Sequence, residues 1–219
     1  MLFDLRSRGR RRTVQVVYLT LALVMGGGLI LFGVGTGSGI GGLLNAFTGN
    51  GSNQQSSIIT QQQKTAQKAV KAAPNSAAAW GNLVSADWEA ASGNGYDSSS
   101  NTYTATGKKE LGEVASAWQR YTSLTSSPSA DVSILAANAY AALGDYSQEA
   151  AAWDDETVAQ PSDLKGFECL AISAYAAKQT REGDLAANKA AAMMPKANRK
   201  TVLSEIDEAK TQPTEAQSC

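Results

Sequence analysis

Apolar residues recur at spacings of three and four through most of the chain after residue 56, which is the period of a helix with one buried face. The clearest case is the segment 108–125, where Leu111, Val114, Trp118 and Tyr121 fall on one side. The pattern predicts an all-α fold. Helices are expected over about 57–73, 75–91, 108–125, 130–143, 146–159, 163–178, 182–193 and 198–211.

The segment 13–34 has a different pattern, because it holds no charged residue and is rich in valine and leucine. Twenty-two residues of helix extend about 33 Å, which matches the roughly 30 Å hydrocarbon core of a bilayer. We therefore expect a transmembrane helix over 13–34. The alternative is a cleaved signal peptide, but its apolar region is typically about 7–15 residues long and ends at a small-x-small site. The nearest candidate site, 44–46, begins with Leu44.

The charge is distributed unevenly along the chain. Residues 1–12 hold five arginines against Asp4 and carry a local charge of +4, whereas the remaining residues carry −5. Arginines beside a transmembrane helix mark its cytoplasmic end, so we expect 1–12 to be a cytoplasmic tail and the rest to lie outside the cytoplasm. The acidic body lacks the basic stripe that nucleic-acid binding requires. This indicates a single-pass protein that contacts the lipid bilayer and binds no nucleic acid.

Glycines crowd the end of the apolar segment and the residues after it. Gly33, Gly37 and Gly41 are spaced four apart, which is a small-residue stripe that could pack closely on another membrane helix. The simpler interpretation is that the helix frays there into a linker. Residues 35–56 are rich in glycine and serine, a composition typical of a flexible tether.

A repeated phrase organises the second half of the chain. Leu135, Ala136 and the run 139–142 recur 35 residues later as Leu170, Ala171 and the run 174–177. Pro128, Pro161 and Pro195 follow one another at steps of 33 and 34 residues. A period of about 34 residues with two helices per period is typical of tetratricopeptide repeats.

The chain therefore resembles the tetratricopeptide repeat family over residues 57–211. The turn Leu143-Gly144-Asp145-Tyr146 is similar to the family's glycine-acid-aromatic connection, whereas the matching turn at 179–183 lacks the glycine. The resemblance implies a short α-solenoid of antiparallel helix pairs, with 57–73 and 198–211 as its end helices. Residues 212–219 are expected to be disordered. In layout, the chain is similar to the membrane-anchored ancillary subunit of the bacterial Sec translocon.

The resemblance also implies a binding groove, because in this family the first helix of each repeat lines a concave surface that holds polypeptide. None of the positions concerned is basic, so clamping of a terminal carboxylate is not expected. Trp88 is the candidate anchor, with packing on the following helix as its alternative role. The candidate groove residues are Ser85, Trp88, Glu89, Asp131, Ile134, Asn138, Cys169 and Ser173.

One long insertion departs from the family pattern. Residues 92–107 form a polar segment where the family has a tight turn, and Tyr96 and Tyr103 lie within it. Loops of this length are uncommon in compact domains unless they are functional or disordered. A partner contact and a plain flexible insertion both fit the composition.

Composition excludes several kinds of chemistry. The chain has no histidine, which removes histidine-dependent nucleophiles and imidazole metal sites. Its two cysteines, Cys169 and Cys219, are too few for a zinc knuckle, and the sequence leaves open whether they pair. The carboxylates of Asp87, Glu89 and the run 154–156 are expected on solvated helix faces. We expect no enzyme activity, no cofactor, no metal and no small-molecule substrate.

The sequence thus predicts a membrane-anchored protein-interaction module outside the cytoplasm, acting as a scaffold or chaperone-like assembly factor. Its partners would be exported polypeptides or members of a membrane complex. The alternative is an accessory subunit of a larger membrane complex that is held mainly through its transmembrane helix and linker.

Overall fold

The structure is a computed structural model that describes residues 51–219, with the side chains of 56–219 apart from Ser218. The predicted cytoplasmic tail, the transmembrane helix 13–34 and the glycine stripe Gly33, Gly37 and Gly41 lie outside the described residues. No helix within 51–219 has the length and apolarity needed to cross a membrane. Residues 56–219 form one compact unit.

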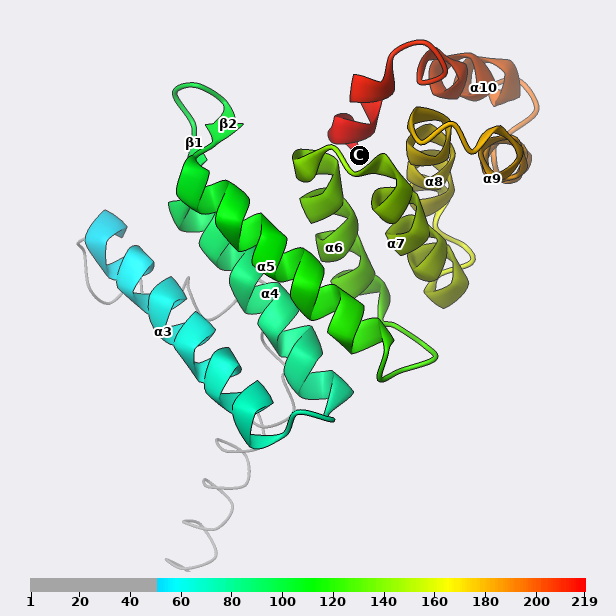
Figure 1. Cartoon of the computed structure of the whole chain (residues 1–219). Helices are drawn as coiled ribbons and strands as arrows, with labels where there is room; N and C mark the ends of the chain where they lie inside the picture. Colours follow the sequence, from blue (N-terminus) through cyan, green and yellow to red (C-terminus); the bar gives the residue numbers. More distant parts are fainter. Residues whose placement is uncertain (1–50) are drawn as a thin grey trace, which may run out of the picture. The chain divides into compact units, whose positions relative to one another are not determined.

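This unit is helical apart from one short hairpin, which confirms the predicted all-α class (Figure 1). The bounds of most helices agree with the hydrophobic pattern to within a few residues. The elements are α3 (Gly51–Ala72), α4 (Ala77–Asn94), β1 (Tyr96–Asp97), β2 (Thr102–Tyr103), α5 (Ala105–Thr122), α6 (Ala130–Leu143), α7 (Tyr146–Ala159), α8 (Leu164–Ala176), α9 (Thr180–Met193), α10 (Arg199–Glu208) and the 3₁₀ helix η1 (Pro213–Ser218).

Helices α3, α4 and α5 lie side by side at the start of the unit (Figure 1). Ile59, Ala66 and Val70 share one face of α3 and are buried. The helix begins at Gly51, which is earlier than the pattern predicted. Extending an existing helix is favourable, because each added residue forms one backbone hydrogen bond while only its own dihedral angles become fixed. The side chain of Ser76 caps α4 by accepting from the amide of Ala79.

The insertion between α4 and α5 is shorter and more ordered than a plain loop. Tyr96 pairs with Tyr103, and Asp97 with Thr102, in a two-stranded antiparallel ladder. The two tyrosine rings meet edge to face with centroids 5.1 Å apart, and the Tyr96 hydroxyl donates to Asn101 Oδ1 at 2.5 Å. Thr104 then caps α5 and starts that helix three residues before the predicted position. The tyrosines therefore stabilise the hairpin itself.

The next four helices form two successive hairpins, α6 with α7 and α8 with α9, and α7 packs on α8 to join them. Small residues make this close packing possible. Ala136, Ala139, Ala171 and Ala174 are fully buried at the repeated positions. Tyr140 and Tyr175 are also buried, so both fill space within the core, as their repeated positions predicted.

The last residues of the chain differ from the sequence-based prediction. Residues 212–219 were expected to be disordered, but η1 packs on α8 and also contacts α6. Cys219 forms a disulfide with Cys169 of α8, and Ala216 is fully buried. Composition could not predict this order, because the segment is mostly polar and is attached through a disulfide and one buried methyl group. Helix α10 contacts α9 and α8 at the same end of the unit.

The two hairpin turns are equivalent in their hydrogen bonds but differ in sequence. After α6, Gly144 has φ +76 and its amide donates to Ala141, while the Asp145 amide donates to Tyr140. After α8, Lys178 takes the same place with φ 63, and the amides of 178 and 179 donate in the same way. A side chain is strained in this left-handed region, so the lysine is less favourable than the glycine.

Replacing Lys178 with glycine should therefore stabilise the unit by about 0.5–1 kcal/mol, since relief of strain outweighs the added freedom of the unfolded chain. Urea unfolding of a fragment spanning 51–219 would measure the change. The matched variant is Gly144→Ala, whose added methyl group meets no atom within 4 Å and so tests the backbone alone. It should destabilise by about 1 kcal/mol. A neutral result for both variants would contradict the assignment of strain to this position.

Candidate functional site

Three of the predicted groove residues, Ser85, Trp88 and Glu89, lie on α4. Trp88 is half-buried: it packs against the core and keeps some access to solvent. Ser85 is also half-buried and its hydroxyl donates to the carbonyl of Gly81 at 3.3 Å. Glu89 is exposed. This helix thus offers one partly exposed aromatic ring between a hydroxyl and a carboxylate.

Three further predicted residues lie on α6. Asp131 is exposed in the first turn of that helix, while Ile134 and Asn138 are half-buried. Ile134 contacts the core with part of its side chain. Helices α4 and α6 are in contact, so the two sets belong to adjacent helices. These six residues keep some access to solvent and are the open part of the predicted groove.

The two predicted residues on α8 are not open. Cys169 and Ser173 are fully buried, and the Ser173 hydroxyl donates to the carbonyl of Cys169 at 2.6 Å. Cys169 is bonded to Cys219, and α8 packs on α7, α9, α10 and η1. On α8, the predicted groove positions are therefore buried by the chain's own residues.

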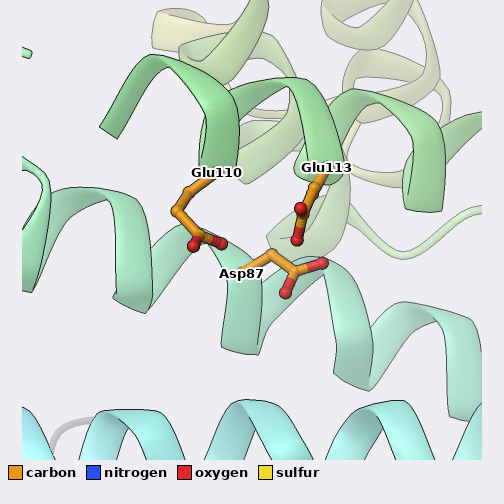
Figure 2. Close-up of side chains that lie close together, drawn as sticks. All are labelled: Asp87, Glu110 and Glu113. Carbon is orange, nitrogen blue, oxygen red and sulfur yellow. The ribbon is translucent and has the colours of Figure 1, made fainter. Parts of the chain in front are cut away.

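A cluster of three acidic residues lies where α3, α4 and α5 meet. The sequence pattern did not predict that these residues come together. The carboxylates of Asp87, Glu110 and Glu113 point toward one another, with one oxygen from each within 4.8 Å of the others (Figure 2). Gln63 of α3 donates through Nε2 to Asp87 Oδ1 at 2.9 Å and to Glu110 Oε2 at 2.6 Å. Carboxylates at this spacing could ligate a hard divalent cation, but the amide already engages two of them.

The environment of Asp87 favours its protonated form. Its side chain is only 2% exposed, and burial raises its pKa from 3.8 to about 6. The hydrogen bond from Gln63 opposes this rise, and the negative charges of Glu113 and Glu110 add to it. Protonation of Asp87 below about pH 6 would therefore reduce the repulsion between the three carboxylates.

A second set of buried acids lies on α7. Glu149, Trp153 and Glu156 follow at spacings of four and three on its buried face, and both glutamates are fully buried. No oxygen of either carboxyl group accepts a hydrogen bond, and the indole Nε1 of Trp153 is also without an acceptor. The Glu156 carboxylate lies over Gly166 of α8, where a Cβ atom would overlap it. A side chain at this position would require the end of the Glu156 side chain to move.

Burial is the main cause of the altered acidity of these two groups. It raises the pKa of Glu149 to about 8, which the neighbouring Trp153 indole opposes only in part. It raises the pKa of Glu156 to about 7, and Asp163 adds to the rise. Each carboxyl group lies in surroundings of low dielectric constant without a cation to offset its negative charge. Binding a proton removes that charge.

These positions correct the expectation of solvated carboxylates. Asp87 and Glu156 are buried, whereas Glu89 and Asp154 are exposed as expected and Asp155 is intermediate. The spacing held a signal that could have revealed this: Glu149 and Glu156 share the period of Trp153, so a helical projection places all three on one face.

A surface groove of about 800 Å³ lies over α8 between α7 and α9. It carries both signs of charge, from Lys178, Arg181 and Lys189 against Asp154 and Glu182. The ammonium group of Lys189 lies 5.6 Å from the centre of the Phe167 ring, which also lines the groove. None of the eight predicted groove residues borders it, so sequence reasoning missed this surface.

Comparisons with models of protein families, with curated proteins and with solved structures give no match to this chain.

Changing Asp87 to asparagine should stabilise the unit at pH 7, because the amide removes the energetic penalty of a buried negative charge and still accepts from Gln63. For a carboxyl group with a raised pKa, the folded state is favoured below the unfolded pKa and loses that contribution as pH rises through the folded pKa. We expect a gain of about 1–2 kcal/mol at pH 7 that disappears toward pH 4. Chemical denaturation across this range would measure it. The exposed Asp154→Asn change is the control, and an equal pH-independent gain in both variants would contradict the account.

The free energy of unfolding should fall as pH rises from about 5 to 9, because Glu149 and Glu156 bind their protons more tightly in the folded state than in the unfolded state. Each group contributes at most about 1.4 kcal/mol per pH unit at the steepest point. The double variant E149Q/E156Q should show a flatter profile in the same denaturation experiment. Glu208→Gln, an exposed change on α10, should keep the wild-type slope. A double variant with the wild-type slope would show that other groups titrate.

Proposed function

We propose that this chain is a membrane-anchored interaction module in which a tetratricopeptide-like stack of helix pairs, outside the cytoplasm, holds other polypeptides as a scaffold or chaperone-like assembly factor. The stack would comprise the hairpins from α4 to α9, with α3 and α10 as its end helices. The open part of its groove would be the surface of α4 and α6 that carries Trp88, Asp131 and Asn138.

The regularity of the two hairpins after Pro128 supports this proposal. Helices α6, α7 and α9 each have 14 residues and α8 has 13, and the same alanine and tyrosine positions are buried in both copies. Units of matched length that share their core positions stack in one direction and leave the first helices along one surface. Such a surface binds extended polypeptide without a deep pocket.

One observation carries the proposal. Residues 213–219, a short polypeptide segment, pack on the helix that carries the predicted positions Cys169 and Ser173 and are bonded to Cys169. The family resemblance assigns these same positions to polypeptide binding. The surface therefore accommodates a peptide of the kind that the proposed function requires.

The location outside the cytoplasm is supported by two independent features. The apolar segment 13–34 follows five arginines, as in a helix inserted with its N-terminus inside. A disulfide between Cys169 and Cys219 persists in oxidising compartments and is rare in the reducing cytosol.

The alternative function is that of an accessory subunit held in a membrane complex through the segment 13–34 and the linker. The spacing of Gly33, Gly37 and Gly41 favours this alternative, since small residues at this interval permit close helix contact in bilayers. The two functions differ in which part of the chain binds. Capture of the same partners by a fragment spanning 51–219 supports the proposed function, and their loss supports the alternative.

The proposed groove can be tested by site-specific photocrosslinking of the full chain in its native membranes. A crosslinking side chain at Asp131 should capture polypeptide partners, and Trp88→Ala should reduce their yield at least about fivefold, because a large aromatic ring typically dominates such contacts. The same crosslinker at Val158, which is 74% exposed on α7, is the control position.

Because Trp88 also packs on the core, Asn138→Arg gives a second variant that places bulk and charge in the groove while deleting no packing atoms. Both variants are compared with wild type by thermal unfolding. Equal capture from Asp131 and Val158, or full capture by both variants, would refute binding at this groove.

A further inference from the structure

Residues 213–219 are held on the rest of the unit by few interactions. Ala216 is their one fully buried side chain among those described. Gln217 donates through Nε2 to the hydroxyl of Tyr146 at 3.4 Å, which is a long hydrogen bond. The ion pairs of the described residues lie elsewhere, at Lys109 with Glu113 and at Lys210 with Asp184 and Asp207. The remaining attachments are the packing of η1 on α8 and α6 and the covalent bond from Cys219 to Cys169.

The energetic balance of this segment depends on that bond. Ordering seven residues opposes docking, and one buried methyl group with one long hydrogen bond does little to offset it. The disulfide keeps the segment beside α8 regardless, because it joins the two at a Cα separation of 5.5 Å. Without the bond, the segment should spend most of its time away from α8, still tethered to the chain through α10.

We propose that residues 213–219 are a redox-controlled plug: they fill the polypeptide-binding face of α8 while Cys169 and Cys219 are oxidised, and they leave it for a polypeptide partner when the disulfide is reduced. This inference rests on the proposed function, since it concerns the regulation of the same groove. The partner would be a short, mostly uncharged polypeptide segment that can form a helical turn, matching the Pro-Thr-Glu-Ala-Gln sequence of η1 that it replaces.

The two cysteine residues differ in exposure, from which we infer that a reductant attacks at the more exposed one. Cys169 is fully buried, whereas Cys219 is partly exposed. A thiolate of a dithiol reductant can therefore reach Cys219 Sγ, form a mixed disulfide there and release Cys169 as the thiolate, which takes up a proton. The second thiol of the reductant then displaces Cys219. In total, the reductant loses two electrons and two protons and becomes a disulfide, and the chain gains two thiols.

Release would extend the open groove. The surface on α4 and α6 would be joined by the α8 face around Cys169 and Ser173, so that three first helices could contact one partner. In the oxidised chain only α4 and α6 are open at the predicted positions. The proposal therefore explains why six predicted groove residues retain access to solvent and the two on α8 do not.

Hydrogen exchange of the full chain in detergent micelles tests the release directly. Reduction with a phosphine, which forms no mixed disulfide with the protein, should raise exchange at the amides of Ala216 and Cys219 at least about tenfold. The amides of α8 should keep their protection. The variant Cys219→Ser should show the released state without any reductant and with the buried Cys169 unchanged, and Ser204→Ala on exposed α10 surface should behave as wild type.

Crosslinking from Asp131 in native membranes then tests the consequence for binding. Partner capture by Cys219→Ser should exceed that of the oxidised wild-type chain at least about threefold. A synthetic peptide with the sequence of residues 211–218 should compete with the partner for Cys219→Ser but not for the oxidised chain.

The outcomes separate this inference from the proposed function. Unchanged exchange at Ala216 after reduction would overturn the plug and leave the proposed function untouched. Loss of α8 protection together with residues 213–219 would also overturn it, by showing that the bond maintains the helix. Release without any gain in capture would overturn the control of binding. Absence of capture in both redox states, despite release, would refute the proposed function instead.

Discussion

The structure depends on one constraint, which is that no helix pair in this chain can bury its apolar face without a neighbour. The pairs α6–α7 and α8–α9 bury many alanines, so the interior of one such pair removes little apolar surface from water. Burial becomes sufficient only when α7 packs on α8 and thereby joins two pairs. Alanine at 136, 139, 171 and 174 sets the close approach, and Tyr140 and Tyr175 fill the wider gaps. Substitutions that enlarge these positions would separate the pairs.

The buried carboxyl groups are unusual in a core of this kind. Asp87 shares an amide with its neighbours, whereas Glu149 and Glu156 have no hydrogen-bond partner for their oxygens. At neutral pH Glu149 is accommodated by binding a proton, Glu156 binds one for part of the time, and Asp87, whose pKa is about 6, is mostly ionised. The charge of the core therefore varies with pH. The first and second halves of the unit each contain one of these sites. The stability of both halves is therefore coupled to the same variable, the proton concentration.

The sequence predicted most of the fold because its main determinants are local. The periodic apolar positions, the cap Ser76 and the glycine after α6 set helix type and approximate length before any tertiary contact is known, whereas the cap Thr104 was not predicted. The features that it missed depend on distant residues. The Cys169–Cys219 bond joins positions 50 residues apart, and only coordinates show that η1 reaches α8. Burial of Glu156 likewise depends on Gly166 in the next helix.

The same distinction applies to the candidate groove. The residues that the family resemblance assigned to a groove lie on α4, α6 and α8. The resemblance gave no information about which positions the chain itself covers. The open surface over α8, between α7 and α9, was also missed, because its charged side chains come from a turn and two helices that are separate in the sequence.

The disulfide also makes the end of the unit a closed covalent ring. Residues 169–219 include most of α8, all of α9 and α10, and their connections. In a chain-entropy description, closing a ring of about 50 residues disfavours the unfolded state by about 4 kcal/mol. A protease that cuts once inside this ring releases no fragment, because both pieces stay joined through sulfur. A single cut within residues 169–219 thus leaves every residue of the chain covalently joined.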